Sequence, residues 1–111
     1  MAAYKLTVRR RGATTRERFA SLPEALAALD ARLDDLATGA RRGRERGLVR
    51  DVEPVAQVAL RAEVAGPGAR GGIDVRGDVS AEAYTGRWRR VLIKRAPDET
   101  ACDALRRVLG A

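Results

Sequence analysis

The chain has 111 residues, enough for one domain that buries roughly two-thirds of the surface exposed by its unfolded chain. It contains 22 basic and 15 acidic residues, a formal net charge of +7, and no His. Without His, the chain lacks the commonest general base, the Ser-His and Cys-His nucleophile pairs and the commonest zinc ligand. We therefore expect a single domain over residues 1–111 that is not an enzyme and holds no metal or cofactor.

The first ten residues, MAAYKLTVRR, lack the apolar segment of a signal peptide, and no apolar run approaches the roughly 18 residues of a membrane span. Cys102 is the only cysteine, so no intrachain disulfide can form, as is usual in a reducing compartment. These features predict a cytoplasmic protein without a membrane segment. Lys occurs only at positions 5 and 94 and Asn is absent, which is the usage expected of a GC-rich bacterial genome.

The N-terminal residues predict a β-hairpin. Residues 4–11 (YKLTVRRR) are partly β-branched and half alternating, and residues 15–20 (TRERFA) alternate again. Gly12-Ala13-Thr14 supplies the turn between these two strands.

A helix is predicted over about residues 22–37. Ser21 and Glu24 have the spacing of a capping box, Pro23 lies in the first turn, and Gly39 is expected at the C-cap. Leucines recur within the helix at 4-3-4-3 spacing, namely Leu22, Leu26, Leu29, Leu33 and Leu36. Since this stripe covers only two heptads, burial against a sheet is favoured over a coiled-coil seam.

Two further segments follow the helix. Residues 40–47 (ARRGRERG) have no apolar anchor, so they predict an exposed loop. Residues 49–64 predict a long strand that is started or kinked at Pro54, because apolar and other side chains alternate from Ala56 to Val64.

Residues 66–78 (GPGARGGIDVRGD) contain two familiar strings. Gly66, Gly68 and Gly71 match the G-x-G-x-x-G loop of dinucleotide-binding proteins, but such a loop must open a helix, and here the chain continues into a short strand at Ile73–Val75. Arg76-Gly77-Asp78 matches the RGD tripeptide. We interpret both strings as turns of one meander, with positive φ at the glycines.

The last third of the chain predicts a strand and a helix. Residues 81–94 favour a strand because β-branched and aromatic residues cluster there and Gly86 lies inside the segment; a helix capped by Ser80 is the alternative. Residues 97–110 predict a closing helix, with Pro97-Asp98-Glu99 at its start and Gly110 at its end. The fold class is therefore α+β: a two-layer ββαβββα domain, with a mainly antiparallel five-stranded sheet and two helices on one face.

From Leu22 onward, the order α-β-β-β-α is similar to that of the double-stranded RNA-binding domain, and Gly66-Pro67 lies between the first two of these strands, as in that family. The family begins its last helix with the basic Lys-Lys-x-Ala-Lys motif, whereas this chain has the acidic Pro97-Asp98-Glu99-Thr100. The family's His after Gly-Pro is also missing. The resemblance is one of topology.

Few side chains are candidates for a catalytic or metal-binding role. We interpret Ser21 as a helix cap and Ser80 as a turn residue. Cys102 lies on the apolar stripe of the closing helix, where it acts as a small hydrophobic residue. Asp30 and Asp34 are i, i+4 neighbours that could share a divalent cation, but a solvated helix face is the favoured interpretation. Nothing indicates a small-molecule substrate.

The leading functional hypothesis rests on charge. The first helix is acidic, so helices on one face of the sheet would leave the positive charge on the other face and in the 41–46 loop. We expect a non-enzymatic module that binds a polyanion, RNA or DNA, with aromatic side chains at Tyr84 and Trp88 available to stack bases. The expected contacts are Arg9, Arg11, Arg41, Arg42, Arg44, Arg46, Arg87, Trp88, Arg90 and Lys94.

The alternative hypothesis is a protein-interaction or structural module. Its Arg content would then reflect genome composition, and sheet edges, including residues 81–95, would pair between the subunits of a homodimer.

Overall fold

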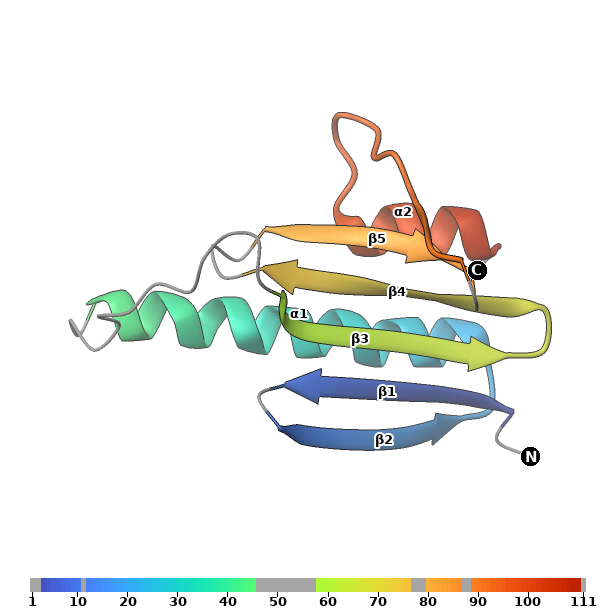
Figure 1. Ribbon diagram of the computed structural model, residues 1–111, viewed down its shortest axis with the longest axis horizontal. Helices are drawn as coiled ribbons and strands as arrows, with labels where there is room; N and C mark the ends of the chain where they lie inside the picture. The colour runs from blue at the N-terminus through green and yellow to red at the C-terminus, as the bar shows by residue number, and fades with distance from the viewer. Residues whose placement is uncertain (1–2, 11, 46–57, 77–79, 87–88, 111) are drawn as a thin grey trace.

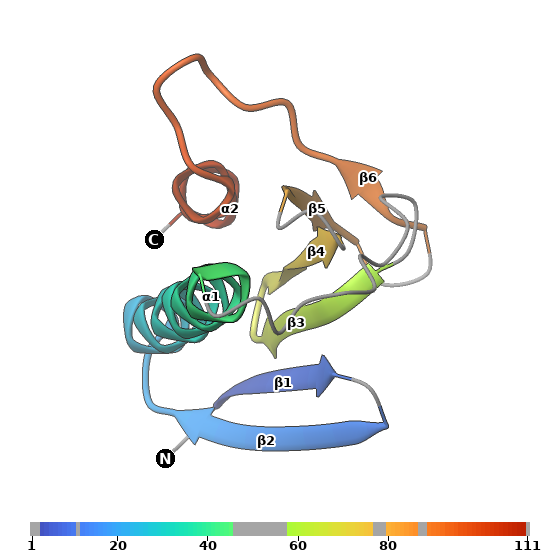
Figure 2. The ribbon, with the colours of Figure 1, turned by 90° about the vertical axis from the view of Figure 1, so that its left-hand side faces the viewer.

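The computed structural model describes residues 3–10, 12–45, 58–76, 80–86 and 89–110, with the backbone alone for residues 36–45 and 58–59. Its six strands form one antiparallel sheet in the order β2-β1-β3-β4-β5-β6. Both helices cover the same face of this sheet (Figure 1, Figure 2). The two-layer α+β prediction is confirmed, but the sheet has six strands instead of five. The elements are β1 Tyr4–Arg10, β2 Ala13–Phe19, α1 Leu22–Glu45, β3 Val58–Gly66, β4 Ala69–Arg76, β5 Ala81–Thr85, β6 Val91–Leu92 and α2 Ala101–Leu109.

The N-terminal hairpin is formed by β1 and β2, which pair from Tyr4 opposite Phe19 to Arg10 opposite Ala13. The turn is shorter than predicted, because Ala13 and Thr14 already belong to β2. Gly12 has a φ of +80°, a conformation that glycine adopts without steric cost. This one glycine allows the strands to reverse within two residues.

Helix α1 begins as its sequence predicts. The backbone N–H of Glu24 donates to Ser21 Oγ at 3.3 Å, so Ser21 caps the first turn. The helix continues to Glu45, so the end predicted at residue 37 and the C-cap predicted at Gly39 are wrong. Residues 38–45 (TGARRGRE) continue the helix without an apolar stripe in the part that projects beyond the sheet (Figure 1). Ala, Arg and Glu favour this extension, while Gly39 and Gly43 oppose it.

The Gly66-Pro67-Gly68 segment is the turn between β3 and β4, as predicted, and Gly68 has a φ of +68°. Pro before a positive-φ Gly is the residue pattern of a type II turn. Gly71 and Gly72 lie inside β4, which begins at Ala69, so the interpretation of Gly71 as a turn residue is wrong. Their role is close packing: a Cβ atom on Gly71 would lie 2.7 Å from the Tyr84 carbonyl oxygen.

Residues 81–94 form two strands instead of one. β5 and β6 pair antiparallel, with Tyr84 opposite Leu92, and Gly86 has a φ of +109° just after β5. The helix considered for residues 81–94 is therefore wrong. The single strand predicted there is also corrected, because β5 is followed by a reversal and a short edge strand, β6. β4 and β5 are also antiparallel, while the reversal predicted at Gly77-Asp78 lies outside the described residues.

Helix α2 starts later than predicted. Thr100 is its N-cap and forms a full capping box with Asp103, and Gly110 closes it in the left-handed conformation. The Pro97-Asp98-Glu99 segment therefore precedes the helix. β6 also adds a strand before α2, so the order from α1 onward departs from the α-β-β-β-α topology of the double-stranded RNA-binding domain.

The core is aliphatic and lies between the helices and the sheet. α1 packs on β1, β2 and β3, while α2 packs on β4 and β5. Leu26 and Leu29 of the leucine stripe are fully buried against this sheet, as predicted, together with Leu105 of α2. No helix among the described residues is long and apolar enough to cross a membrane.

Candidate nucleic-acid interface

Strand alternation divides the sheet into a helix-covered face and an open face. Leu6, Val64 and Ile73 are buried beneath the helices. Their neighbours along each strand point to the opposite side, because successive side chains alternate. Figure 1 views the sheet from this open face, with the helices behind it.

Basic side chains outnumber acidic ones on the open face of β1 to β5. The register brings three acidic residues to it: Glu63, Asp74 and Glu82. The basic residues on the same face are Lys5, Arg9, Arg16, Arg18, Arg61, Arg70 and Arg76. This excess is the distribution predicted from the sequence.

Each of the three carboxylates is held by an arginine of a neighbouring strand. Arg9 Nη1 lies 2.8 Å from Glu63 Oε1, and Arg76 Nε lies 2.7 Å from Glu82 Oε1.

The third pair is bidentate. Arg61 donates from Nε to Asp74 Oδ1 at 2.7 Å and from Nη2 to Asp74 Oδ2 at 3.1 Å. This end of the open face is therefore close to neutral.

The other end of the open face is not neutralised. Arg18, Lys5, Ala65 and Arg70 lie side by side across β2, β1, β3 and β4, and Arg16 lies two residues from Arg18 along β2. Among the described residues, Lys5, Arg16, Arg18 and Arg70 take part in no ion pair. We call these four residues the cation row. With strands about 4.8 Å apart, Arg18 and Arg70 start about 14 Å from each other.

Tyr84 lies on the open face but is 2% exposed, so it offers no surface for base stacking. Arg90 Cζ lies 4.9 Å from the centroid of the Tyr84 ring, a cation–π distance. A Cβ atom on Gly72 would lie 2.7 Å from the Tyr84 hydroxyl, so only glycine leaves room for this ring. Burial raises the pKa of Tyr84 to about 12, with Glu63 and Asp74 adding to the shift.

The predicted contact residues are scattered. Arg9 is on the open face but paired with Glu63, while Arg90 covers Tyr84 and Lys94 is exposed just beyond β6. The loop predicted for residues 41–46 is wrong in its first part, because Arg41, Arg42 and Arg44 belong to α1. Arg11, Arg46, Arg87 and Trp88 lie outside the described residues.

The cation row was missing from the predicted contact set. Its members come from three strands, and only the register brings them together: Lys5 opposite Arg18, Lys5 opposite Ala65, and Ala65 opposite Arg70. The sequence signal that could have revealed these residues was the alternation of apolar and polar side chains along the strands. Lys5 precedes the apolar Leu6 and Arg70 follows Ala69, so both point away from a predicted apolar face.

The helical layer has a different surface. Four acidic residues and one Arg lie on α1 up to residue 35, namely Glu24, Asp30, Asp34, Asp35 and Arg32. Arg32 pairs with Glu17 of β2, and the exposed Asp34 and Asp35 form no ion pair among the described residues. This part of α1 therefore carries net negative charge, in contrast to the cation row on the other side of the sheet.

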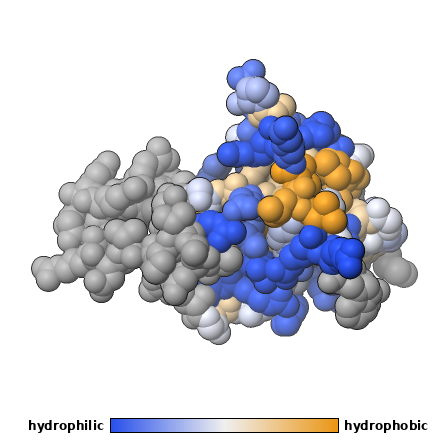
Figure 3. Space-filling view, turned by 45° about the horizontal axis from the view of Figure 1, so that its top comes forward, coloured by the Kyte–Doolittle hydropathy of each residue, from blue (hydrophilic) through white to orange (hydrophobic). Residues whose placement is uncertain are grey.

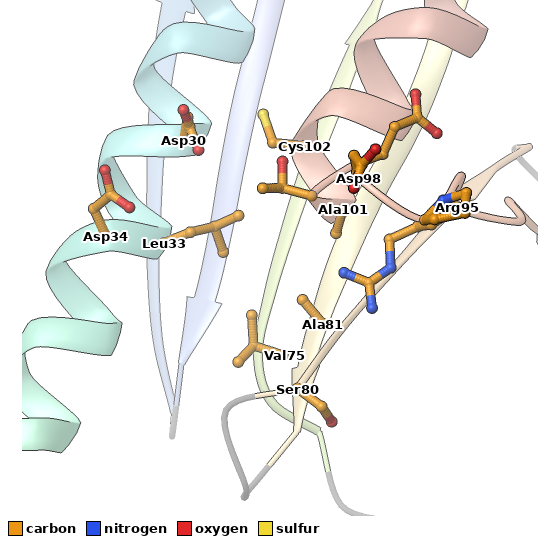
Figure 4. A pocket seen from close by; sticks show the side chains of 13 residues that line it. Asp30, Leu33, Asp34, Val75, Ser80, Ala81, Arg95, Asp98, Ala101 and Cys102 are labelled. Atoms are coloured by element: carbon orange, nitrogen blue, oxygen red, sulfur yellow. The ribbon is translucent and has the colours of Figure 1, made fainter.

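A cavity of about 450 Å³ lies between α1, α2 and the segment that leads into α2. Asp30 and Asp34 line one wall, Arg95 and Asp98 the opposite one (Figure 4). Among the described residues, no cluster of three His, Cys, Asp or Glu side chains has the arrangement needed to hold a metal ion.

The segment beside this cavity is fixed by Glu99. Arg107 donates two hydrogen bonds to this carboxylate, both at 2.9 Å, and the Ala96 N–H donates a third at 2.8 Å. These contacts, with Arg107 the strongest, lower the pKa of Glu99 to about 2. Glu99 therefore acts as a structural tie.

Cys102 also borders the cavity and is buried, as its place on the apolar stripe predicted. Burial raises the pKa of its thiol to about 11, so the thiol is protonated at neutral pH and is a poor nucleophile.

A scan against protein-family models, a search of curated proteins and a search of solved structures found no match to this chain.

Proposed function

We propose that this protein binds nucleic acid through the open face of its sheet. The carrying observation is the cation row, Lys5, Arg16, Arg18 and Arg70, which has no acidic partner among the described residues. The other three basic residues of the face are engaged with carboxylates. The row is thus the part of the face that is best suited to accept phosphates.

The mode of binding follows from what is exposed. Arginine and lysine side chains contact phosphates irrespective of sequence, and each contact releases counterions from the nucleic acid. Tyr84 is buried beneath Arg90, so it contributes no stacking platform. We therefore expect salt-sensitive binding with little sequence preference.

Fluorescence anisotropy with labelled oligonucleotides tests this function. Single-stranded RNA, single-stranded DNA and a DNA duplex, each of about 20 nucleotides per strand, are titrated with the protein in about 50 mM NaCl. We expect saturable binding that weakens steeply as salt is raised and differs little between homopolymer and mixed sequences. No anisotropy change at any protein concentration tested would contradict the proposal.

The helical arginines Arg41, Arg42 and Arg44 are a separate predicted contribution. Replacing all three with Ala removes charge without touching the cation row. If they also contact phosphates, the salt dependence of binding should become shallower by about 2–3 units on a log-log scale.

The homodimer stays a prediction. Sedimentation velocity over a range of protein concentrations distinguishes a monomer from a stable dimer.

A further inference from the structure

The edge strand β6 has an unusual surface. Val91 is 57% exposed and Leu92 is 66% exposed, the two most exposed of the large apolar side chains among the described residues. Figure 3 shows hydrophobic surface on this side of the molecule, bordered by hydrophilic side chains. Edge strands in soluble proteins usually carry charge at such positions, because an apolar edge invites pairing with another chain.

The backbone of β6 is open to such pairing at Leu92. The Ile93 N–H donates to the Ala83 carbonyl at 2.9 Å, so Ile93 is the residue turned toward β5. In an antiparallel pair, the direction of the backbone groups alternates along the strand. The N–H and C=O of Leu92 therefore point away from β5, and neither has a backbone hydrogen-bond partner among the described residues.

Four basic residues flank the apolar pair, with Arg89 and Arg90 before it and Lys94 and Arg95 after it. All four are exposed, and among the described residues none forms an ion pair. The edge thus combines outward backbone groups at Leu92, an apolar centre and cations on both sides, while the Lys94 carbonyl next along the edge already accepts a hydrogen bond from Arg107 Nη2 at 3.1 Å.

This charge pattern favours one kind of binding partner at the β6 edge over the others. In a symmetric antiparallel pair of two β6 strands centred on Leu92, Arg90 of each copy would face Lys94 of the other, and like charges opposite each other destabilise a sheet. Nucleic acid has no strand backbone to extend the sheet. An extended peptide with an apolar centre and acidic flanks can form main-chain hydrogen bonds with Leu92, cover the apolar pair and place carboxylates beside the cations.

We propose that the β6 edge binds an acidic segment of a partner protein by adding it as a seventh strand beside Leu92. Main-chain hydrogen bonds give this interaction its affinity, and the flanking carboxylates give it its selectivity. The surface is distinct from the cation row, which lies on β1, β2 and β4.

The probe is a fluorescein-labelled peptide, Glu-Glu-Val-Thr-Val-Glu-Glu, titrated by anisotropy. The diagnostic variant is Leu92→Pro, which removes the outward N–H and leaves the β5 ladder intact, since proline is tolerated where the N–H of an edge strand faces solvent. Leu92→Ala is the matched control, because it shortens the side chain but keeps the N–H. We expect Leu92→Pro to weaken binding about tenfold and Leu92→Ala about threefold or less.

Three further measurements keep the test decisive. The same peptide N-methylated at alternate residues should bind about tenfold more weakly if strand addition occurs, whatever the stability of Leu92→Pro. A Lys-for-Glu version of the peptide should not bind. The Arg16→Gln, Arg18→Gln, Arg70→Gln variant should bind the acidic peptide as the unmodified protein does.

Equal binding of methylated and unmethylated peptide would overturn the proposal, as would loss of binding in the cation-row variant alone. A concentration-dependent dimer that disappears in Leu92→Pro would assign the edge to a second copy of the chain and would also overturn it. Failure of oligonucleotide binding has no bearing on this result, because the two surfaces are probed by different variants.

Discussion

The two faces of the sheet use the same strands for different purposes. On the covered face, Leu6, Val64 and Ile73 are buried by α1 and α2, and packing decides which residues are tolerated. On the open face, charged side chains determine the properties of the surface, and they are unevenly distributed. The ion pairs Arg9–Glu63, Arg61–Asp74 and Arg76–Glu82 neutralise one end, while the cation row leaves the other end positive.

This difference separates stability from function in one sheet. Substitutions on the covered face should unfold the protein and leave the chemistry of the surface alone. Substitutions in the cation row should change binding and leave stability nearly unchanged, since exposed charges contribute little to folding.

The largest expected effect is on the covered face. Leu26 is fully buried against the sheet, so Leu26→Ala should lower the free energy of unfolding by about 2–5 kcal/mol. Urea denaturation followed by circular dichroism measures this change. Under conditions where the variant is folded, its oligonucleotide affinity should match that of the unmodified protein. A change of affinity without a change of stability would contradict the division between the faces.

A smaller effect is expected at Tyr84, the one fully buried aromatic residue of the open face among the residues that the structure describes. An unfolded tyrosine ionises near pH 10, whereas the pKa of Tyr84 in the fold is about 12. Above pH 10 the unfolded state therefore binds fewer protons than the folded state, and stability falls as pH rises toward 12. The loss should be about 2 kcal/mol by pH 12.

Tyr84→Phe tests the assignment of this pH dependence. Among the described residues, the Tyr84 hydroxyl has no hydrogen-bond partner, so its removal should cost little stability at neutral pH. The variant should also be less sensitive to pH between 10 and 12. An unchanged alkaline profile would show that another group is responsible.

The smallest expected effect comes from a substitution that adds positive charge to the open face instead of removing it. Glu63→Gln releases Arg9 from its ion pair and adds positive charge to the open face. Stability should change by less than about 1 kcal/mol, and oligonucleotide affinity at low salt should increase a few-fold. Asp35→Asn, at an exposed position of α1, alters net charge equally and should leave the affinity unchanged. Weaker binding by Glu63→Gln would argue against the open face.

Local signals in the sequence predicted several elements well. Ser21 and Glu24 marked the start of α1, and Gly66-Pro67-Gly68 marked the β3–β4 turn, because capping and turn chemistry act over a few residues. The end of α1 was missed, because its final turns lie beyond the apolar stripe and Gly39, which has the sequence signature of a C-cap, lies inside the helix. The separation of β5 from β6 at Gly86 was also missed, since a glycine within an alternating run does not reveal where the chain reverses.

The site was harder to predict than the fold. Alternation predicted that positive charge collects on the open face, but the partners of individual arginines depend on register. Arg9 looked available in the sequence, yet it faces Glu63 from a strand more than fifty residues away. Arg70 lies in the 66–78 segment that was interpreted as turns, yet it belongs to β4 and completes the cation row opposite Ala65. These relationships are set by tertiary pairing.

The central claim is that the cation row contacts phosphates. The most direct test compares the salt dependence of oligonucleotide binding in two triple variants of equal net charge. One carries Arg16→Gln, Arg18→Gln and Arg70→Gln on the open face; the other carries Arg10→Gln, Arg32→Gln and Arg106→Gln on the helical side. The slope of log Kd against log salt should fall by about 2–3 units in the first variant and stay unchanged in the second. Equal losses in both, or no loss in the first, would contradict the account.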